Sequence, residues 1–221
     1  MNLYFRRLIR LFLGIFLYAL GIVVTLQAKI GYAPWDVFHD GISKTTGISF
    51  GTASIIVGIV IIIIAVLLGE KLGIGTIANI ILIGLIIDIL LAIGFIPAAP
   101  NFILGILMLI SGLFVIAFAT FFYMGSAFGS GPRDSLMVAL TRITRLPPGV
   151  CRSAIELIAL CAGWLLGGEV GIGTVISAVA IGFCIQITFT LLKFRPTDIK
   201  HEQLNETYIK IHKRLVLERK I

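Results

Sequence analysis

Charged residues and cysteines are both scarce in this sequence, and each shortage excludes a class of protein. Only 13% of the 221 residues are charged, whereas 58% are hydrophobic. A soluble domain of this length cannot bury that much apolar surface, so lipid must be the solvent for most of the chain. The three cysteines lie in apolar stretches without metal-ligand spacing, which predicts small packing residues rather than disulfides or a metal site.

Motifs that mark catalysis are absent as well. The sequence contains no nucleotide-binding loop, no nucleophile elbow and no His-Glu-x-x-His pair. It therefore predicts no enzyme, no catalytic residue and no cofactor. The formal net charge of +7 suits anionic lipid headgroups better than nucleic acid, because no nucleic-acid-binding module accompanies it.

The hydrophobic residues gather in six long runs. A helix needs about 20 apolar residues to cross the hydrocarbon core of a bilayer, or about 17 at the short end. The runs cover residues 8–28, 51–68, 73–96, 102–124, 149–167 and 172–192. The sequence therefore predicts an all-α integral membrane protein with six transmembrane helices.

Lysine and arginine are distributed unevenly between these runs. If the N-terminus is inside, the inner segments and the C-terminal tail hold 16 of the 18 basic residues, and the outer segments hold only Lys29 and Lys44. Cytoplasmic segments of membrane proteins carry such an excess. We therefore expect both termini to be cytoplasmic.

The two halves of the sequence resemble each other. Residues 31–92 align with residues 129–190 without a gap, at an offset of 98 residues. The identical positions include a proline, an aspartate and six glycines, which apolar composition alone does not explain. Because each copy holds three spans, the second copy is predicted to lie upside down relative to the first, as in many transporters. The predicted fold is two inverted three-span repeats, residues 1–98 and 99–195.

A basic tail, residues 196–221, follows the second repeat. Its apolar residues recur at helical spacing among lysines and arginines. This pattern favours an amphipathic helix on the inner leaflet, in contact with anionic lipids. A solvated, partly frayed tail is the alternative.

A Gly-x-x-Pro-x-Asp segment follows the first span of each repeat. Glycine permits a tight turn, proline fits the first position of a helix, and aspartate complements the positive end of a helix. Each segment therefore predicts a short helix of about 12 residues, or about 18 Å, which is too short to span the membrane. The residues concerned are Gly31, Pro34 and Asp36 in the first copy and Gly129, Gly131, Pro132 and Asp134 in the second.

These short helices have two possible positions. As re-entrant helices, they would enter from opposite faces and bring their N-terminal ends to the midplane, where free N–H groups can bind an anionic group. The aspartates would then either cap the helices or bind a cation or an amine. As interfacial helices, they would only fasten adjacent spans.

Several polar residues lie near or inside the spans. Asp88 and its repeat mate Gln186 predict either substrate or proton binding or a structural hydrogen bond between helices. Arg152 and Glu156 are four residues apart, which favours a mutual ion pair. The recurring Gly-Ile-Gly-Thr sequence at residues 73–76 and 171–174 predicts a tight turn with threonine as the helix N-cap.

The sequence resembles the YczE/YitT-type family of bacterial inner-membrane proteins. The resemblance lies in the run from Gly31 to Gly41, in residues 73–76 and in the run from Gly129 to Leu136. It extends to about residue 195 and is closer to the YczE branch, since the YitT branch usually carries a soluble C-terminal domain. It implies a multi-pass protein of the bacterial inner membrane, without assigned binding residues.

Three hypotheses follow for the function. The first is a transporter or permease with a site for a small metabolite between the repeats, which Gly31, Pro34, Asp36, Asp88, Gly129, Gly131, Pro132, Asp134 and Gln186 would form. The second is the substrate-binding membrane subunit of a larger importer. The third is a regulatory or scaffolding membrane protein without a ligand. The substrate is not specified by the sequence, and a homo-oligomer or an importer partner is compatible with the first two.

Overall fold

Eight α-helices make up the part of the chain that the computed structural model describes, residues 3–195, 199 and 202–203. Six of these helices are long and apolar enough to cross a membrane, in agreement with the six predicted runs. They are α1 (Leu3–Gln27), α3 (Phe50–Leu67), α4 (Ile74–Ile93), α5 (Phe102–Ser126), α7 (Pro148–Leu165) and α8 (Ile172–Leu191). Almost all of the predicted amphipathic tail, residues 196–221, lies outside the described residues.

The other two helices are short and begin where the sequence predicts. α2 (Pro34–Thr46) and α6 (Pro132–Thr144) have 13 residues each, and each has proline in its first turn. Proline is favoured there because its fixed φ suits a helix and its missing N–H has no partner to lose. Each helix ends at a residue in the left-handed conformation, Gly47 in α2 and Arg145 in α6.

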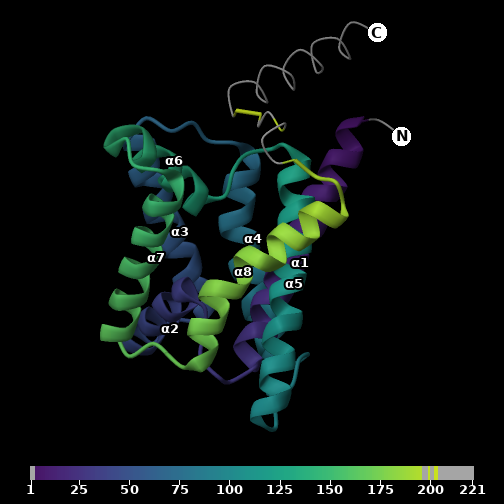
Figure 1. The fold of residues 1–221 in the computed structure, drawn as a ribbon, viewed down its shortest axis with the longest axis vertical. Helices are drawn as coiled ribbons and strands as arrows, with labels where there is room; N and C mark the ends of the chain where they lie inside the picture. The colour runs from purple at the N-terminus through teal and green to yellow at the C-terminus, as the bar shows by residue number, and fades with distance from the viewer. Residues whose placement is uncertain (1–2, 196–198, 200–201, 204–221) are drawn as a thin grey trace, which may run out of the picture.

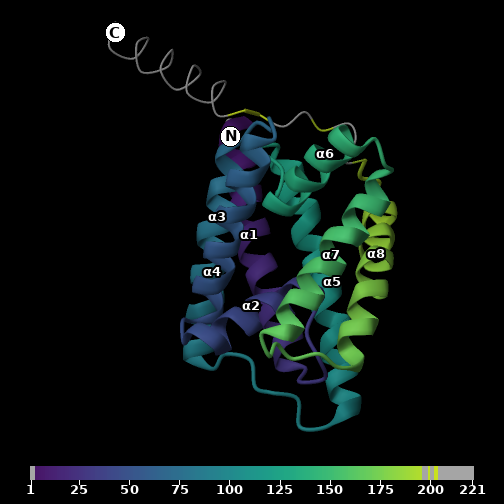
Figure 2. The same cartoon turned by 90° about the vertical axis from the view of Figure 1, so that its left-hand side faces the viewer.

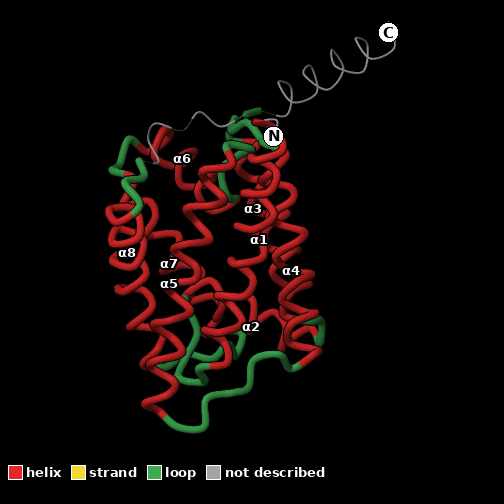
Figure 3. The backbone as a smooth tube through the Cα atoms, turned by 90° about the vertical axis from the view of Figure 1, so that its right-hand side faces the viewer, coloured by secondary structure: helices red, strands yellow, loops and turns green. Residues whose placement is uncertain are grey.

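The two short helices lie at opposite ends of the helical bundle. Figure 1 shows α6 at the same end of the bundle as the beginning of α1, and α2 toward the other end. Figure 2 shows the same separation from the side, so these ends are called the α6 end and the α2 end. The long loop of residues 94–101 joins α4 to α5 across the α2 end (Figure 3).

The α1–α5 pair forms the centre of the bundle. Glycines let the two backbones approach closely: a Cβ added at Gly14 would lie 2.6 Å from the backbone nitrogen of Tyr123, and one added at Gly112 would lie 3.1 Å from that of Thr25. Lipid provides no hydrophobic drive between spans, so close packing of small residues is a main source of their association.

The Gly-Ile-Gly-Thr turn of each half contacts the other half. The N–H of Gly75 donates to the carbonyl of Phe128 at 2.8 Å, and the N–H of Gly173 donates to the carbonyl of Ile30 at 2.7 Å. The two donors lie 98 residues apart in the sequence, and so do the two acceptors. A Cβ at Gly73 would lie 2.1 Å from the oxygen of Phe128, so glycine is required for this approach.

Threonine is not the N-cap of α4 or α8, which corrects one expectation from the sequence. The N-caps are Gly73 and Gly171, and the threonines lie within the first turn. The hydroxyl of Thr76 donates to the carbonyl of Ser130 at 2.6 Å, whereas that of Thr174 accepts from the N–H of Gly171 at 3.1 Å. The beginning of α4 is therefore set by backbone contacts between the halves, and that of α8 by such contacts together with the cap from Thr174.

The two ends of the bundle are packed differently. α2 packs against α7 and buries seven residues, whereas α6 packs against α3 and buries two. α3 also packs against α4, but no comparable packing joins α7 to α8 in the described part of the chain. The α2 end is thus the more tightly closed one.

Replacing Gly73 with alanine tests the contact between the halves. The added methyl group has no room beside Phe128, and overpacking of this kind typically costs about 1–3 kcal/mol. We expect the free energy of unfolding, measured by denaturant titration in detergent, to fall by that amount. Gly182→Ala is the matched control, because a Cβ there meets nothing within 4 Å. Equal stability of both variants would contradict the close approach.

Candidate functional site

A cavity of about 120 Å³ lies inside the bundle, and every described helix except α8 contributes to its wall. The polar and aromatic residues of the wall are Tyr18, Trp35, His39, Ser54, Asn79, Thr120, Tyr123, Arg133, Asp134, Arg152 and Glu156. Because these residues come from both halves of the chain, the cavity exists only where the halves meet.

The N-terminal ends of α2 and α6 meet at this cavity. Trp35 is the second residue of α2 and Arg133 is the second residue of α6. The guanidinium carbon of Arg133 lies 4.7 Å from the centre of the Trp35 ring, which is a cation–π contact. The two short helices lie toward opposite ends of the bundle, and their N-terminal ends therefore meet at the same place.

Arg152 of α7 is the centre of a charged cluster on the cavity wall. Its Nε donates to Oε1 of Glu156 at 3.1 Å, so the ion pair expected from the sequence is present. Its Nη1 lies 3.7 Å from Oδ1 of Asp134, across the boundary between α7 and α6. The side chain of Arg152 is about half exposed, which leaves this cluster open to a ligand or to water.

Asp36 and His39 form a second, deeply buried pair on α2. The residues are 4% and 2% exposed, and Nδ1 of His39 lies 3.7 Å from Oδ1 of Asp36. That nitrogen makes no hydrogen bond to the described residues. The edge of the imidazole ring also contacts Phe50, with ring centres 5.6 Å apart. A polar nitrogen that lines a cavity without a partner is costly unless a ligand or water completes it.

The predicted residues of the Gly-x-x-Pro-x-Asp segments all lie at or beside the cavity ends of the short helices. Gly131, Pro132 and Asp134 line the cavity. Pro34 and Asp36 flank Trp35 and are buried behind it. The remaining two, Gly31 with φ +108 and Gly129 with φ +135, form the preceding turns and pack against Gly171 and Gly73.

Asp88 and Gln186 lie away from the cavity. Oδ1 of Asp88 accepts from the N–H of Gly51 at 2.8 Å, and Oδ2 accepts from the hydroxyl of Ser49. Asp88 thus joins α4 to the beginning of α3, where a negative charge is favourable. Gln186 is exposed on α8. These contacts correspond to the structural alternative for Asp88.

Several wall residues were not assigned to the site by sequence reasoning. Arg152 was expected only to pair with Glu156. Trp35, His39 and Arg133 were not predicted to bind a ligand. One signal was available for Arg133, since it lies within a segment whose neighbours on both sides were predicted to bind substrate. No periodicity in the sequence indicated that it would contact Trp35.

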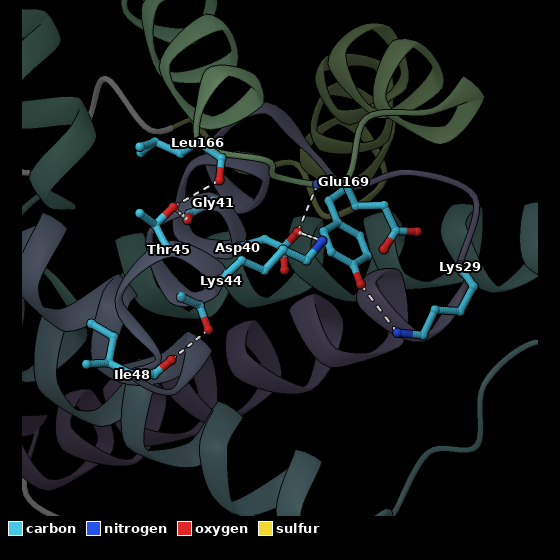
Figure 4. Close-up of polar contacts among 10 residues, drawn as sticks. Lys29, Asp40, Gly41, Lys44, Thr45, Ile48, Leu166 and Glu169 are labelled. Atoms are coloured by element: carbon cyan, nitrogen blue, oxygen red, sulfur yellow. Dashed lines mark hydrogen bonds and ion pairs between the residues drawn. The ribbon is translucent and has the colours of Figure 1, made fainter.

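The α2 end of the cavity is closed by polar contacts between α2 and the α7–α8 loop (Figure 4). Asp40 accepts from the N–H of Glu169 at 2.8 Å and pairs with Lys44 at 2.7 Å. The hydroxyl of Thr45 lies 3.0 Å from the carbonyl of Leu166, to which it donates. At the α6 end, Arg142 makes the corresponding contacts to the α3–α4 loop, with Glu70 at 3.1 Å and with the carbonyl of Leu68.

Replacing Asp88 with alanine separates its structural role from a binding role. The change removes a charged acceptor from Ser49 and Gly51, and a hydrogen bond to a charged group contributes about 1.5–3 kcal/mol. We expect the free energy of unfolding in detergent to fall by about that amount. Gln186→Ala is the control and should have little effect. Unchanged stability of Asp88→Ala would argue against a structural role of Asp88 at the beginning of α3.

The comparisons with known proteins give a family but no activity. Residues 5–190 match a family described as "Family of unknown function (DUF6198)". An uncharacterized membrane protein of Bacillus subtilis (strain 168), YczE, is 32% identical over 80% of this chain and 82% of its own length. An uncharacterized protein of Haemophilus influenzae is 33% identical over 83% of this chain and 86% of its own length.

A third relative, the uncharacterized protein YyaS of Bacillus subtilis (strain 168), is 26% identical over 82% of this chain and 91% of its own length. No solved structure matches the chain. The resemblance to YczE-type proteins that the sequence motifs indicate is therefore confirmed. The chain is a YczE-like multi-pass membrane protein and belongs to the family of unknown function DUF6198.

Proposed function

We propose that this protein is a transporter that moves a small metabolite across the membrane through the central cavity. The observation that carries the proposal is the meeting of Trp35 and Arg133: two half-length helices from opposite ends of the bundle bring their N-terminal ends to one cavity. Half-helices that end at a site between two repeats are a recurring design of secondary transporters.

The proposal treats the two halves as inverted repeats with three spans each. The matched pair of hydrogen bonds, Gly75 to Phe128 and Gly173 to Ile30, supports this relation because each bond maps onto the other at the sequence offset of 98. The central helices α1 and α5 support it too. Gly14 of α1 contacts the backbone of Tyr123 in α5. The positions 98 residues away, Gly112 of α5 and Thr25 of α1, make the equivalent contact.

The charges on the cavity wall support a polar substrate. An ionisable side chain near the centre of a bilayer costs at least ~2.5–3.5 kcal/mol, so such residues usually face a protein interior or a water-filled cavity and mark a substrate pathway. Arg133, Asp134, Arg152 and Glu156 all line one cavity. A scaffold without a ligand would have no use for this arrangement.

The unequal packing of the two ends supports alternating access. The α2 end, which would face the outside, is closed by Asp40, Thr45 and their partners, whereas α6 is only loosely packed at the end that would face the cytoplasm. The structure then corresponds to an inward-facing state. In the outward-facing state, α6 and α3 would take the tight packing that α2 and α7 have here.

Cysteine labelling tests transport without knowledge of the substrate. Ser54→Cys would be made in a chain whose Cys151, Cys161 and Cys184 are replaced by alanine. A membrane-impermeant maleimide would then be applied to inside-out and right-side-out vesicles. We expect labelling from both faces, faster from the cytoplasmic face, because the cavity opens alternately. Ser111→Cys is the control, since Ser111 is exposed on the lipid-facing surface of α5 and should not be labelled.

A disulfide across the α2 end provides the second arm. Thr45→Cys and Leu166→Cys would be oxidised to hold that end closed, which should abolish labelling of Ser54→Cys from the outer face only. Labelling from a single face, with no effect of the disulfide, would contradict alternating access. That result would favour a regulatory membrane protein or the binding subunit of a larger importer.

A further inference from the structure

We propose that the substrate of the transport proposed above is a small zwitterion of the α-amino acid type with an apolar side chain. In this assignment, Arg133 binds the carboxylate, and Asp134 and Glu156 face the ammonium group. The argument rests on the partners that the cavity residues have and lack, on the balance of charge and on the shape of the wall.

Arg133 is prepared to bind a carboxylate. Its guanidinium carbon lies 4.7 Å from the centre of the Trp35 ring, and its side chain has no hydrogen bond or ion pair with any described residue. A guanidinium has five N–H donors in a planar fork that matches a carboxylate. Because the contact with Trp35 is a cation–π contact and not a hydrogen bond, the N–H donors stay available for a ligand.

Two further features of the same place favour an anionic group. The N-terminal turns of α2 and α6 both lie beside Arg133, and each carries partial positive charge from its unpaired N–H groups. His39 also lines the cavity, is 2% exposed and has no hydrogen bond at Nδ1. A carboxylate that accepts from Arg133 and from these helix ends would occupy the side of the cavity nearest α2.

The balance of charge favours a zwitterion over a simple anion. Arg133 and Arg152 line the cavity together with the carboxyl groups of Asp134 and Glu156, and a third carboxyl group, that of Asp36, is buried next to Trp35 on α2. A monoanion would increase the excess of carboxylates and a phosphate would increase it further, whereas a zwitterion adds no net charge. The ammonium group would face the carboxylates of Asp134 and Glu156, which both line the cavity beside Arg152.

The rest of the wall determines the size and polarity of the side chain. Branched apolar residues line it, namely Ile22, Val57, Ile61, Ile80, Ile83 and Ile155. The volume of about 120 Å³ is close to that of an engineered cavity of ~150 Å³ that holds benzene. The cavity therefore fits a compact molecule with a short branched or aromatic side chain rather than a nucleotide, a sugar phosphate or a peptide.

Binding to the purified full-length protein tests the substrate class. The standard protein amino acids would be screened at millimolar concentration by thermal stability in detergent, because a ligand of the folded state raises the melting temperature. Affinities would then be compared by calorimetry for L-leucine, for 4-methylpentanoate, which lacks the amine, and for 3-methylbutylamine, which lacks the carboxylate. We expect L-leucine to bind and each analogue to bind at least tenfold more weakly.

Two arginine variants on the same helix locate the carboxylate site. Arg133→Gln should weaken the binding of L-leucine at least tenfold and leave the weak binding of 3-methylbutylamine unchanged. Arg142→Gln is the matched control and should leave both affinities as in the wild type, because Arg142 contacts the α3–α4 loop and not the cavity. The series of analogues on the wild type keeps the test decisive if Arg133→Gln does not fold.

The outcomes separate the substrate class from transport itself. Binding of 4-methylpentanoate as tight as that of L-leucine would overturn the zwitterion in favour of a carboxylate. No stabilisation by any amino acid, with Ser54→Cys still labelled from both faces, would overturn the substrate class and leave transport standing. Binding of L-leucine with labelling from one face only would instead overturn transport and leave a zwitterion-binding membrane protein.

Discussion

The inability of lipid to form hydrogen bonds is the constraint on which this structure depends. Inside the hydrocarbon region, the end of a helix must find its partners within the protein. α2 and α6 have 13 residues each, too few to cross a bilayer, and their N-terminal ends meet at a cavity that both halves of the chain form. The cavity wall supplies polar side chains beside these helix ends. The same requirement brings Trp35 and Arg133 together and explains why aromatic and charged side chains occur where an ordinary bundle would have leucine.

Much of the fold could be predicted from the sequence because its signals are local. Apolar runs of sufficient length mark the six spans, and the two prolines mark the beginning of the short helices within one residue. The beginning of α1 was predicted less accurately, at residue 8 and not at Leu3, because charged residues such as Arg6 and Arg7 lie before the apolar run.

The candidate site was predicted only in part. Gly131, Pro132 and Asp134 were selected because they belong to a repeated motif, and all three line the cavity. Arg133 was missed because its role arises from a contact with Trp35, almost a hundred residues away in the chain. For Asp88 the sequence left two alternatives open, since a carboxylate inside a span has the same appearance in a sequence whether it caps a neighbouring helix or binds a substrate. Only the packing of the two halves distinguishes these cases.

The exchange of backbone hydrogen bonds between the halves has a consequence for biosynthesis. The N–H of Gly75, at the beginning of α4, is completed by the carbonyl of Phe128, and that residue emerges from the ribosome only after α5 has been made. The beginning of α4 therefore gains this partner only after the second half has been made, so this contact between the halves forms late in assembly.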